Sequence, residues 1–240
     1  MVLYCKEGEI MIAIIAAMIE EVEAIVELMD ESNHKMISRI DFYEGMINNQ
    51  KIVVMKSGVG KGAASMATTI LLEHYDVDFV INIGTAGGLK PQEQVLDAIV
   101  SSNVVQHDFD TSFIDGDSGK GLYFKADEAL VSFVLKVLNS LDINYHVGLV
   151  ASGDLFIAGD KLTNNLTSNY PEAMCCEMEA GAVAQVCSHY QKPFVILRSL
   201  SDVACNQDSH LDFMAYKVHA SKRSAQVTKK VCEMMVDYVS

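Results

Sequence analysis

The amino-acid sequence predicts an α/β protein with a largely parallel or mixed central sheet that helices cover on both faces. The chain has 240 residues, of which 50% are hydrophobic, and this is enough for one large core. Strand-like and helix-like segments alternate along it, as they do in α/β architectures. Several strand-like segments contain continuous apolar runs, such as the whole of Ile10–Ala17, which is typical of strands buried on both faces.

The first half of the chain starts its pattern with the apolar run IMIAIIAA, which predicts a strand. Two glutamates follow, where carboxylates stabilise the start of a helix. The elements expected in this half are a strand at Ile10–Ala17, a helix at Glu20–Met29, a two-stranded stretch around Ile37–Met46 and Lys51–Lys56, a helix at Gly62–His74, and strands at Asp78–Gly84 and Asp97–Val105. We expect residues 1–9 to be an N-terminal extension and residues 10–240 to form a single domain.

The second half opens with a polar segment rich in Gly and Asp, Gln106–Lys120, which predicts a loop. The elements expected after it are a helix at Asp127–Leu141, a strand at His146–Ser152, a helix near Gly159–Thr167, a short strand near Ala173–Cys176, a helix at Glu179–Tyr190, a strand at Pro193–Ser201 and a long helix at about Leu211–Tyr238. The last helix carries Met, Val and Tyr at helical spacing, which indicates a face packed on the core.

Charge and cysteine content exclude several classes of function. A net charge of −14 disfavours binding to nucleic acid and to anionic membranes. The six cysteines show no CxxC pair and no regular spacing with histidine, so they support neither a zinc site nor a disulfide framework. No apolar stretch reaches the roughly 20 residues that a membrane helix needs, and no signal peptide is expected. The sequence therefore predicts a cytoplasmic protein with free thiols and no metal.

Ligands of α/β proteins bind at the carboxyl ends of strands, and the expected strand ends here carry glycines and carboxylates. The Gly-rich turns SGVGKGAAS and GTAGG allow backbone amides to approach a ligand. The first turn is similar to a P-loop, but Gly62 follows Lys61 where a P-loop requires Ser or Thr. A dinucleotide site needs an acidic residue at the end of the next strand, whereas Asp78 begins that strand. Both motifs are therefore excluded.

Acidic residues at the strand ends are candidates for chemistry, and each has a structural alternative. Glu21 stands at a helix start, where it acts in a site or only stabilises the helix dipole. Glu177 and Glu179 are two residues apart, so one can point into a cleft while the other caps a helix. Asp202 ends a buried strand, where a raised pKa suits a general acid, but aspartate is also a good N-cap. Arg198 either pairs with a carboxylate across the site or forms a structural salt bridge.

Six segments together resemble one family. They are, in order, MIAIIAAMIEEV, SGVGKGAAS, NIGTAGG, SGDLFI, EMEAGAVA and RSLSDVA. From about Met11 to the C-terminus the sequence resembles the 5′-methylthioadenosine/S-adenosylhomocysteine nucleosidase family of the purine nucleoside phosphorylase/hydrolase superfamily. The resemblance implies a three-layer α/β/α sandwich with a mixed central sheet, a homodimer, and no metal or organic cofactor. It also implies hydrolysis of the N-glycosidic bond of 5′-methylthioadenosine and S-adenosylhomocysteine, and of 5′-deoxyadenosine, with release of adenine.

The resemblance implies roles for individual residues. Glu21 matches the glutamate that activates the attacking water, and Asp202 matches the aspartate that protonates N7 of adenine. Glu179 matches the glutamate that binds the ribose hydroxyls, with Met178 against the sugar, while Phe156 matches the aromatic ring that stacks on the purine. The other substrate-binding residues implied are Met18, Val59, Thr85, Ala86, Gly87, Ile157, Glu177, Arg198, Ser201 and Phe213.

The chemistry of the reaction fits this arrangement. Adenine leaves readily only when N7 is protonated, the departing base leaves an oxocarbenium-like sugar, and water needs a base on the opposite face. Three carboxylates, Glu21, Glu179 and Asp202, supply these separate roles. The first strand end carries MIEE without arginine, which favours water over phosphate. Alternatives on the same fold are an aminodeoxyfutalosine hydrolase and a phosphate-dependent nucleoside phosphorylase; a catalytically dead nucleoside-binding protein is a further alternative.

Two departures from the family pattern concern the pocket. Thr85 stands where members of the family commonly have serine, and it keeps the hydroxyl. The segment HDFDTSFIDGDSGKGLYF is shorter than the family pattern, which lends apolar residues from this region to the 5′ pocket of the partner subunit. Phe113 and Ile114 are the candidates for that contribution.

Overall fold

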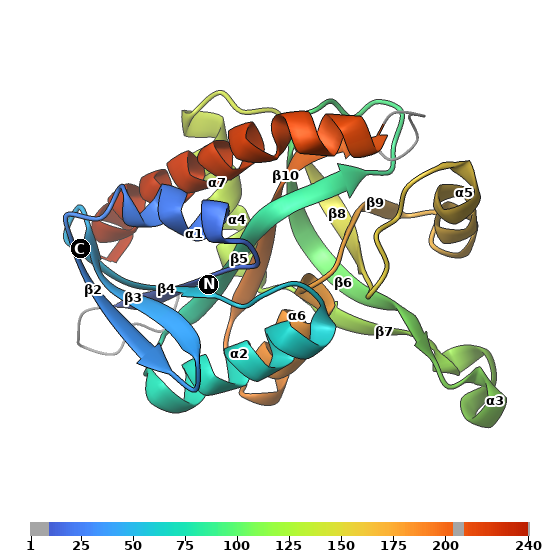
Figure 1. Cartoon of the computed structure of the whole chain (residues 1–240), viewed down its shortest axis with the longest axis horizontal. Helices are drawn as coiled ribbons and strands as arrows, with labels where there is room; N and C mark the ends of the chain where they lie inside the picture. Colours follow the sequence, from blue (N-terminus) through green and yellow to red (C-terminus); the bar gives the residue numbers. More distant parts are fainter. Residues whose placement is uncertain (1–9, 204–208, 240) are drawn as a thin grey trace.

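The computed structural model describes residues 10–203 and 209–239, without the side chains at 203, 209–215, 217 and 236–239. Within them, ten strands form one sheet that helices cover on both faces (Figure 1). The strands are β1 (Met11–Ala16), β2 (Glu31–Ile37), β3 (Ile40–Ile47), β4 (Gln50–Lys56), β5 (Phe79–Gly88), β6 (Ala98–Asp110), β7 (Lys120–Lys125), β8 (Tyr145–Ser152), β9 (Ala173–Glu177) and β10 (Phe194–Val203). The helices are α1 (Ile19–Val26), α2 (Lys61–His74), α3 (Ser112–Asp115), α4 (Glu128–Ser140), α5 (Asp160–Asn169), α6 (Ala180–His189), α7 (Ser209–Val239) and the 3₁₀ helix η1 (Gly116–Gly119). The expected extension at residues 1–9 lies outside the described residues.

The sheet is mixed, as expected, and its order is β10-β6-β8-β9-β5-β1-β4-β3-β2, with β7 paired to β6. β1 pairs in parallel with β4 and β5, and β10 pairs in parallel with β5. The β10–β5 pairing closes β5, β10, β6, β8 and β9 into a ring. The end of β9 crosses the end of β5, where Cys176 pairs with Gly87. The carboxyl ends of β1, β5, β9 and β10 therefore come together.

The two faces of the sheet carry separate cores, which confirms the three-layer architecture. Along β1, Ile12 and Ile14 pack with α1, α4 and α7, while Ala13 and Ile15 pack with α2 and α6. Figure 1 shows these helix groups on opposite sides of the sheet. All four side chains are 0% exposed. A strand buried on both faces needs apolar residues at every position, and this is why the run IMIAIIAA is continuous.

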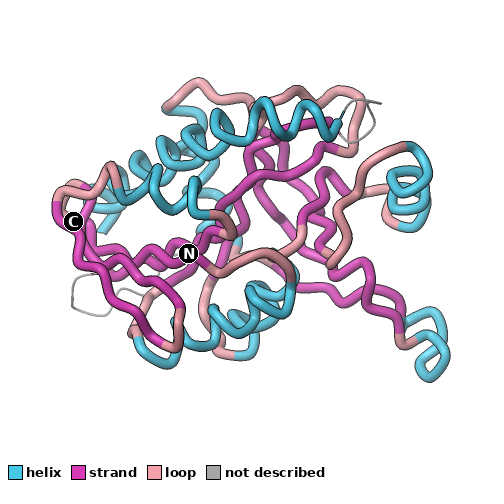
Figure 2. The backbone as a smooth tube through the Cα atoms, in the orientation of Figure 1, coloured by secondary structure: helices cyan, strands magenta, loops and turns pink. Residues whose placement is uncertain are grey.

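The strands β2 and β7 were not predicted, because neither is buried enough to need an apolar pattern in its sequence. β2 has the polar sequence ESNHKMI, is mostly exposed, and pairs only with β3 at the edge of the sheet. β6 continues to Asp110 and pairs with β7, so the loop expected at Gln106–Lys120 is wrong in part. The segment is instead the outer part of a hairpin, with α3 and η1 at its tip, that projects from the body (Figure 2).

Four described cysteines, Cys175, Cys176, Cys187 and Cys232, are buried free thiols. Burial raises the pKa of Cys175, Cys187 and Cys232, so these thiols stay protonated and pack as small apolar groups. Across residues 10–203 and 209–239, no group of His, Cys, Asp and Glu is arranged to hold a metal ion. None of the helices in this part of the chain is long and apolar enough to cross a bilayer.

Candidate active site

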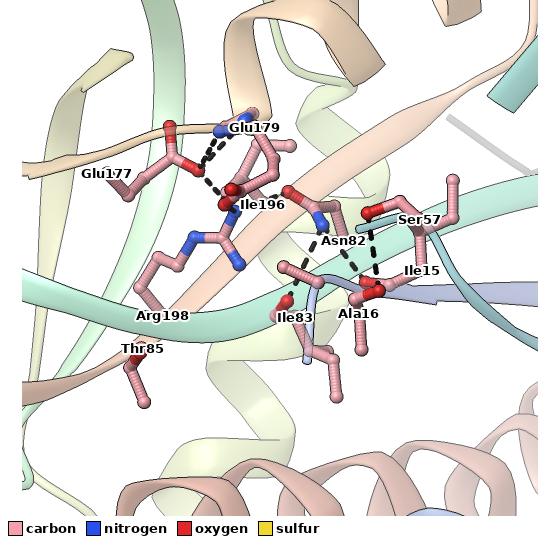
Figure 3. A network of polar contacts seen from close by, with 12 residues as sticks. Ile15, Ala16, Ser57, Asn82, Ile83, Thr85, Glu177, Glu179, Ile196 and Arg198 are labelled. Carbon is pink, nitrogen blue, oxygen red and sulfur yellow. Dashed lines mark hydrogen bonds and ion pairs between the residues drawn. The ribbon is translucent and has the colours of Figure 1, made fainter. Parts of the chain in front are cut away.

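A buried arginine lies at the centre of the site (Figure 3). Arg198 is on β10 opposite Gly84 of β5, and it is 1% exposed. Its Nη2 donates to Oε2 of Glu177 at 2.5 Å and to Oδ1 of Asn82 at 2.6 Å. Asn82 in turn donates from Nδ2 to the carbonyl oxygen of Ile15, which ties the guanidinium to β1. A Cβ atom at Gly84 would lie 2.3 Å from Nη1, so the guanidinium fits only because this residue is glycine.

The charge of Arg198 acts on three carboxylates. Burial by itself lowers the pKa of Arg198, but the charges of Glu177, Glu179 and Glu21 raise it above its ordinary value. The guanidinium therefore stays protonated, and its positive field reaches all three glutamates. Only Glu177 forms a direct hydrogen bond with it among these three.

Glu177, the last residue of β9, fixes the start of α6. Its Oε2 accepts hydrogen bonds from the backbone N–H of Glu179 at 3.0 Å and of Ala180 at 2.8 Å, besides the one from Arg198. Its negative charge lies at the positive end of the α6 dipole. These contacts agree with the capping alternative for one of the two glutamates in this motif, and they leave Glu179 as the residue that points into a cleft.

Glu179 is held by the glycine-rich turn SGVGKG, whose sequence is similar to a P-loop. Its Oε1 accepts a hydrogen bond from the backbone N–H of Gly60 at 2.9 Å. Gly60 has a φ of +92°, which glycine adopts without strain. Burial, followed by the charge of Glu177, raises the pKa of Glu179 to about 7, against the lowering effect of Arg198. The glycine-rich turn thus binds a carboxylate of the protein itself.

Glu21 is buried at the N-terminus of α1. Its Oε2 accepts from the backbone N–H groups of Ala17 and Met18, each at 3.0 Å, in the manner of a residue that reaches back to the helix N-cap. Its Oε1 accepts from the backbone N–H of Thr85 on β5 at 3.2 Å. Burial raises the pKa of Glu21, while the Met18 amide and the charge of Arg198 lower it. Glu21 therefore stabilises its helix and also reaches the end of β5.

Asp202 is placed by an irregularity in β10. The pairing with β5 shifts between Leu200 and Asp202, so that Leu200 faces Ala86, Asp202 faces Gly87, and Ser201 is the extra residue. Such a β-bulge re-aims the side chains that follow it. Asp202 is 2% exposed, and its Oδ1 accepts a hydrogen bond from Oγ of Ser201 at 2.8 Å.

These groups open onto one cleft of about 760 Å³, including its mouth. It is lined by Ala17, Met18, Glu21, Val59, Thr85, Ala86, Gly87, Leu155, Phe156, Ile157, Cys176, Glu177, Met178, Glu179, Arg198, Ser201 and Asp202. Arg198 and the carboxylates form the floor of the cleft, and Leu155, Phe156 and Ile157 form an apolar wall. A volume of this order fits a small ligand with one flat apolar part and one polar part.

Most residues that the sequence predicted for the site line this cleft, and two described residues do not. Phe113 and Ile114 lie on α3 at the tip of the hairpin, 102% and 83% exposed, away from the cleft of their own chain. The side chain of Phe213 lies outside the described residues. Ala17, Leu155 and Cys176 also line the cleft and were not predicted, and neither was Asn82, the partner of Arg198. Leu155 lies inside the quoted motif SGDLFI, and Asn82 is the polar residue within the apolar strand VINIG, a signal that could have marked it.

Comparisons with known proteins agree with this geometry. A family model described as the phosphorylase superfamily matches residues 11–233. A 5′-methylthioadenosine/S-adenosylhomocysteine nucleosidase of Shewanella piezotolerans is 40% identical over 219 residues, which are 89% of this chain and 95% of the relative.

Two solved structures have the same fold. One is 5′-methylthioadenosine/S-adenosylhomocysteine nucleosidase from Neisseria meningitidis in complex with methylthio-immucillin-A, with a TM-score of 0.89, 29% identity, and coverage of 93% of this chain and 99% of the other. The second is the native structure of futalosine hydrolase of Helicobacter pylori, with a TM-score of 0.88, 30% identity, and coverage of 94% and 98%.

The raised pKa of Glu179 predicts a pH dependence of stability. Between the ordinary glutamate value of 4.5 and about 7, the folded protein holds a proton that the unfolded chain has lost. The contribution of Glu179 to the free energy of unfolding is thus fully present below pH 4.5, and it is lost as the pH rises to about 7. Glu179→Gln should therefore weaken the fall in stability across this interval, measured by urea unfolding at several pH values. Glu128→Gln, at an exposed residue, serves as the control. If Glu179→Gln leaves the slope of stability against pH unchanged, the raised pKa of Glu179 is contradicted.

Proposed function

The chain belongs to the phosphorylase superfamily and, within it, to the 5′-methylthioadenosine/S-adenosylhomocysteine nucleosidases, and on this premise we propose that it hydrolyses the N-glycosidic bond of both nucleosides. It is an N-glycosyl hydrolase that releases adenine and the 5-thioribose sugar. We include 5′-deoxyadenosine among the substrates, because the proposed acid, base and sugar-binding groups act on the adenine and the ribose, which all three nucleosides share.

One observation carries the proposal. Three buried carboxylates, Glu21, Glu179 and Asp202, come from the ends of three different strands and line the same cleft. A site that breaks a glycosidic bond needs an acid, a base and a group that binds the sugar, in three separate positions. The apolar wall at Phe156 and Ile157 supplies the remaining need, a face for the purine.

In the proposed mechanism Asp202 gives a proton to N7 of adenine, with the Ser201 hydroxyl holding its carboxyl group in place. The bond between the base and C1′ then breaks, and both of its electrons leave with the neutral adenine. Positive charge develops on the sugar, and the nearby carboxylates stabilise it. Glu21 takes a proton from water, whose oxygen attacks C1′, and burial that raises the pKa of Glu21 suits it to this role of base.

Glu179 binds the ribose hydroxyls and Met178 packs against the sugar. Glu179 suits this role because Gly60 and Arg198 hold its carboxylate without using all of its acceptor sites. Phe156 stacks on the purine, and Ile157 offers its backbone to the base. Met18 and Val59 line the cleft, and we propose that Val59 faces the 5′ substituent.

Hydrolysis is favoured over phosphorolysis by the charges in the cleft. Arg198 is the one cationic side chain among the described residues that line it, and its Nη2 already donates to Glu177 and Asn82. Phosphate binding normally requires free arginine or lysine groups. Carboxylates at the ends of β1 and β9 would repel phosphate and can accept hydrogen bonds from water.

The experiment is to measure adenine release by the purified protein from 5′-methylthioadenosine, S-adenosylhomocysteine, 5′-deoxyadenosine and aminodeoxyfutalosine, with and without phosphate. We expect release from the first three that does not depend on phosphate. A strict requirement for phosphate would contradict the proposal and favour a phosphorylase. Release from aminodeoxyfutalosine alone would favour the alternative on the same fold, and binding without turnover would favour a dead site.

Two isosteric substitutions test the roles of the carboxylates. Glu21→Gln and Asp202→Asn should each lower kcat by at least about a hundredfold, because each removes one proton-transfer group. Glu20→Gln, at the neighbouring residue outside the cleft, is the matched control and should keep the wild-type rate. Thermal unfolding should show that all three variants fold. A near-normal rate in Glu21→Gln or Asp202→Asn would refute the role given to that residue.

We also propose that residues 10–240 form one nucleosidase domain that works in the cytoplasm as a homodimer, in which Phe113 and Ile114 enter the 5′ pocket of the partner subunit. The support is the exposure of both side chains on a hairpin that projects from the body, since adjacent large apolar side chains exposed in this way mark interaction surfaces. Light scattering should give twice the 26.3 kDa of one chain. Phe113→Ala should raise the KM for 5′-methylthioadenosine, and a monomer that is fully active would contradict the proposal.

A further inference from the structure

The motif SGVGKG contains a lysine that the proposed mechanism does not use. Lys61 is the first residue of α2, directly after Gly60, whose N–H holds Glu179. The backbone N–H of Lys61 donates to Oδ1 of Asp154 at 2.7 Å. Neighbouring amides of one turn therefore hold two carboxylates that come from different parts of the chain.

The side chain of Lys61 closes a ring of polar contacts. Its Nζ forms an ion pair with Oδ1 of Asp108 on β6, and it lies 3.4 Å from Oε1 of Gln106. The other oxygen of Asp108, Oδ2, accepts a hydrogen bond from the backbone N–H of Asp154 at 2.9 Å. The ring thus passes from Lys61 to Asp108, from Asp108 to Asp154, and from Asp154 back to Lys61. We call these three residues the Lys61 clasp.

The clasp joins the apolar wall of the cleft to the turn that binds Glu179. Asp154 directly precedes Leu155, Phe156 and Ile157, the apolar wall. Gly60 directly precedes Lys61 and binds Glu179. The clasp therefore fixes the separation between the surface for the purine and the carboxylate for the ribose.

The contacts of Gln106 extend the clasp to α6. Its Nε2 donates to the carbonyl oxygen of Gly181 at 3.1 Å and to Oε1 of Gln185 at 2.8 Å. A Cβ atom at Gly181 would lie 2.5 Å from Cγ of Gln106, so the helix packs closely on β6 there. The N-terminus of α6, which begins just after Glu179, is thereby held from a second side.

The charges of the clasp fit its geometry. Lys61 is the cation of the ring and its Nζ pairs with Asp108, so its loss would leave that partly buried carboxylate without its counter-charge. The Lys61 side chain is 17% exposed and that of Asp108 is 32% exposed, so solvent screens the pair only in part. Burial raises the pKa of Asp108, but the hydrogen bonds from Lys61 and from the Asp154 amide lower it below its ordinary value. Asp108 is therefore charged at neutral pH.

We infer that Lys61, through Asp108 and Asp154, is a positioning residue that sets the distance between the purine wall at Leu155–Ile157 and Glu179, and so determines affinity for the nucleoside part of the substrate. The inference rests on the proposed function. Because the clasp connects to the purine wall and to Glu179, which bind parts that the two nucleosides share, we expect the same effect for small and large 5′ substituents. Because it touches neither Glu21 nor Asp202, it acts on binding more than on the chemical step.

The test is Lys61→Met, which removes the charge and keeps an apolar chain of similar length. The KM for 5′-methylthioadenosine and for S-adenosylhomocysteine should rise by the same factor, about three- to tenfold, with kcat changed less than about threefold. Lys125→Met, which breaks the exposed pair with Glu128, is the control and should leave both parameters unchanged. An unchanged KM in Lys61→Met, a fall in kcat alone, or unequal factors for the two substrates would overturn the inference.

Two further measurements separate positioning from general loss of structure. Asp108→Asn in the Lys61→Met background removes the unpaired charge, so the double variant should have no higher KM than Lys61→Met alone, whereas additive increases would contradict a shared unit. Hydrogen exchange of the peptide over 153–159, without ligand, should be faster in Lys61→Met, and equal exchange would overturn the clasp. If Lys61→Met does not fold, Asp108→Asn alone takes its place with the same expectations. Failure of the proposed function would instead appear as a wild-type protein that releases no adenine.

Discussion

The buried ion pair between Arg198 and Glu177 is the interaction on which the rest of the site depends. A guanidinium that is 1% exposed is costly unless charged and hydrogen-bonding groups surround it. Here Glu177, Asn82 and a glycine opposite provide these partners and the space. The same pair joins the end of β9 to β10 and caps α6, so the position of Glu179 follows from it.

The carboxylates around Arg198 differ in what they bind, and this allows them different roles. Oε2 of Glu177 accepts three hydrogen bonds from the protein, so this oxygen is committed to structure. Glu179 accepts one hydrogen bond, from Gly60, and lies 4.0 Å from Arg198. Its pKa is raised to about 7. Glu21 is held by three backbone amides, two from the turn between β1 and α1 and one from β5. Identical side chains thus become a cap, a proposed sugar ligand and a proposed base because of their surroundings.

Sequence reasoning succeeded where burial or a local motif carries the information. The apolar runs of β1 and of 194–197 in β10 predict a sheet buried on both faces, and the carboxylates that follow these runs line the cleft. It failed for β2, where an exposed edge needs no apolar pattern, and for β7, which a hairpin holds in place. The contacts of Asn82 with Arg198 and of Gly60 with Glu179 join residues 116 and 119 positions apart, so no local pattern could show them. The contacts of Lys61 were not predicted either, because Asp108 and Asp154 come close to it only in the folded chain.

The central claim is that the charge of Arg198 organises the carboxylates for catalysis as well as for folding. Arg198→Met alone would leave Glu177 buried without a counter-charge and would destabilise the protein by about 3–5 kcal/mol, which would mask any catalytic effect. The double variant Arg198→Met/Glu177→Gln removes both charges and should fold. The decisive measurement is its rate of adenine release from 5′-methylthioadenosine. Our account predicts a folded protein at least about a hundredfold slower than wild type, and a folded double variant with a near wild-type rate would contradict it.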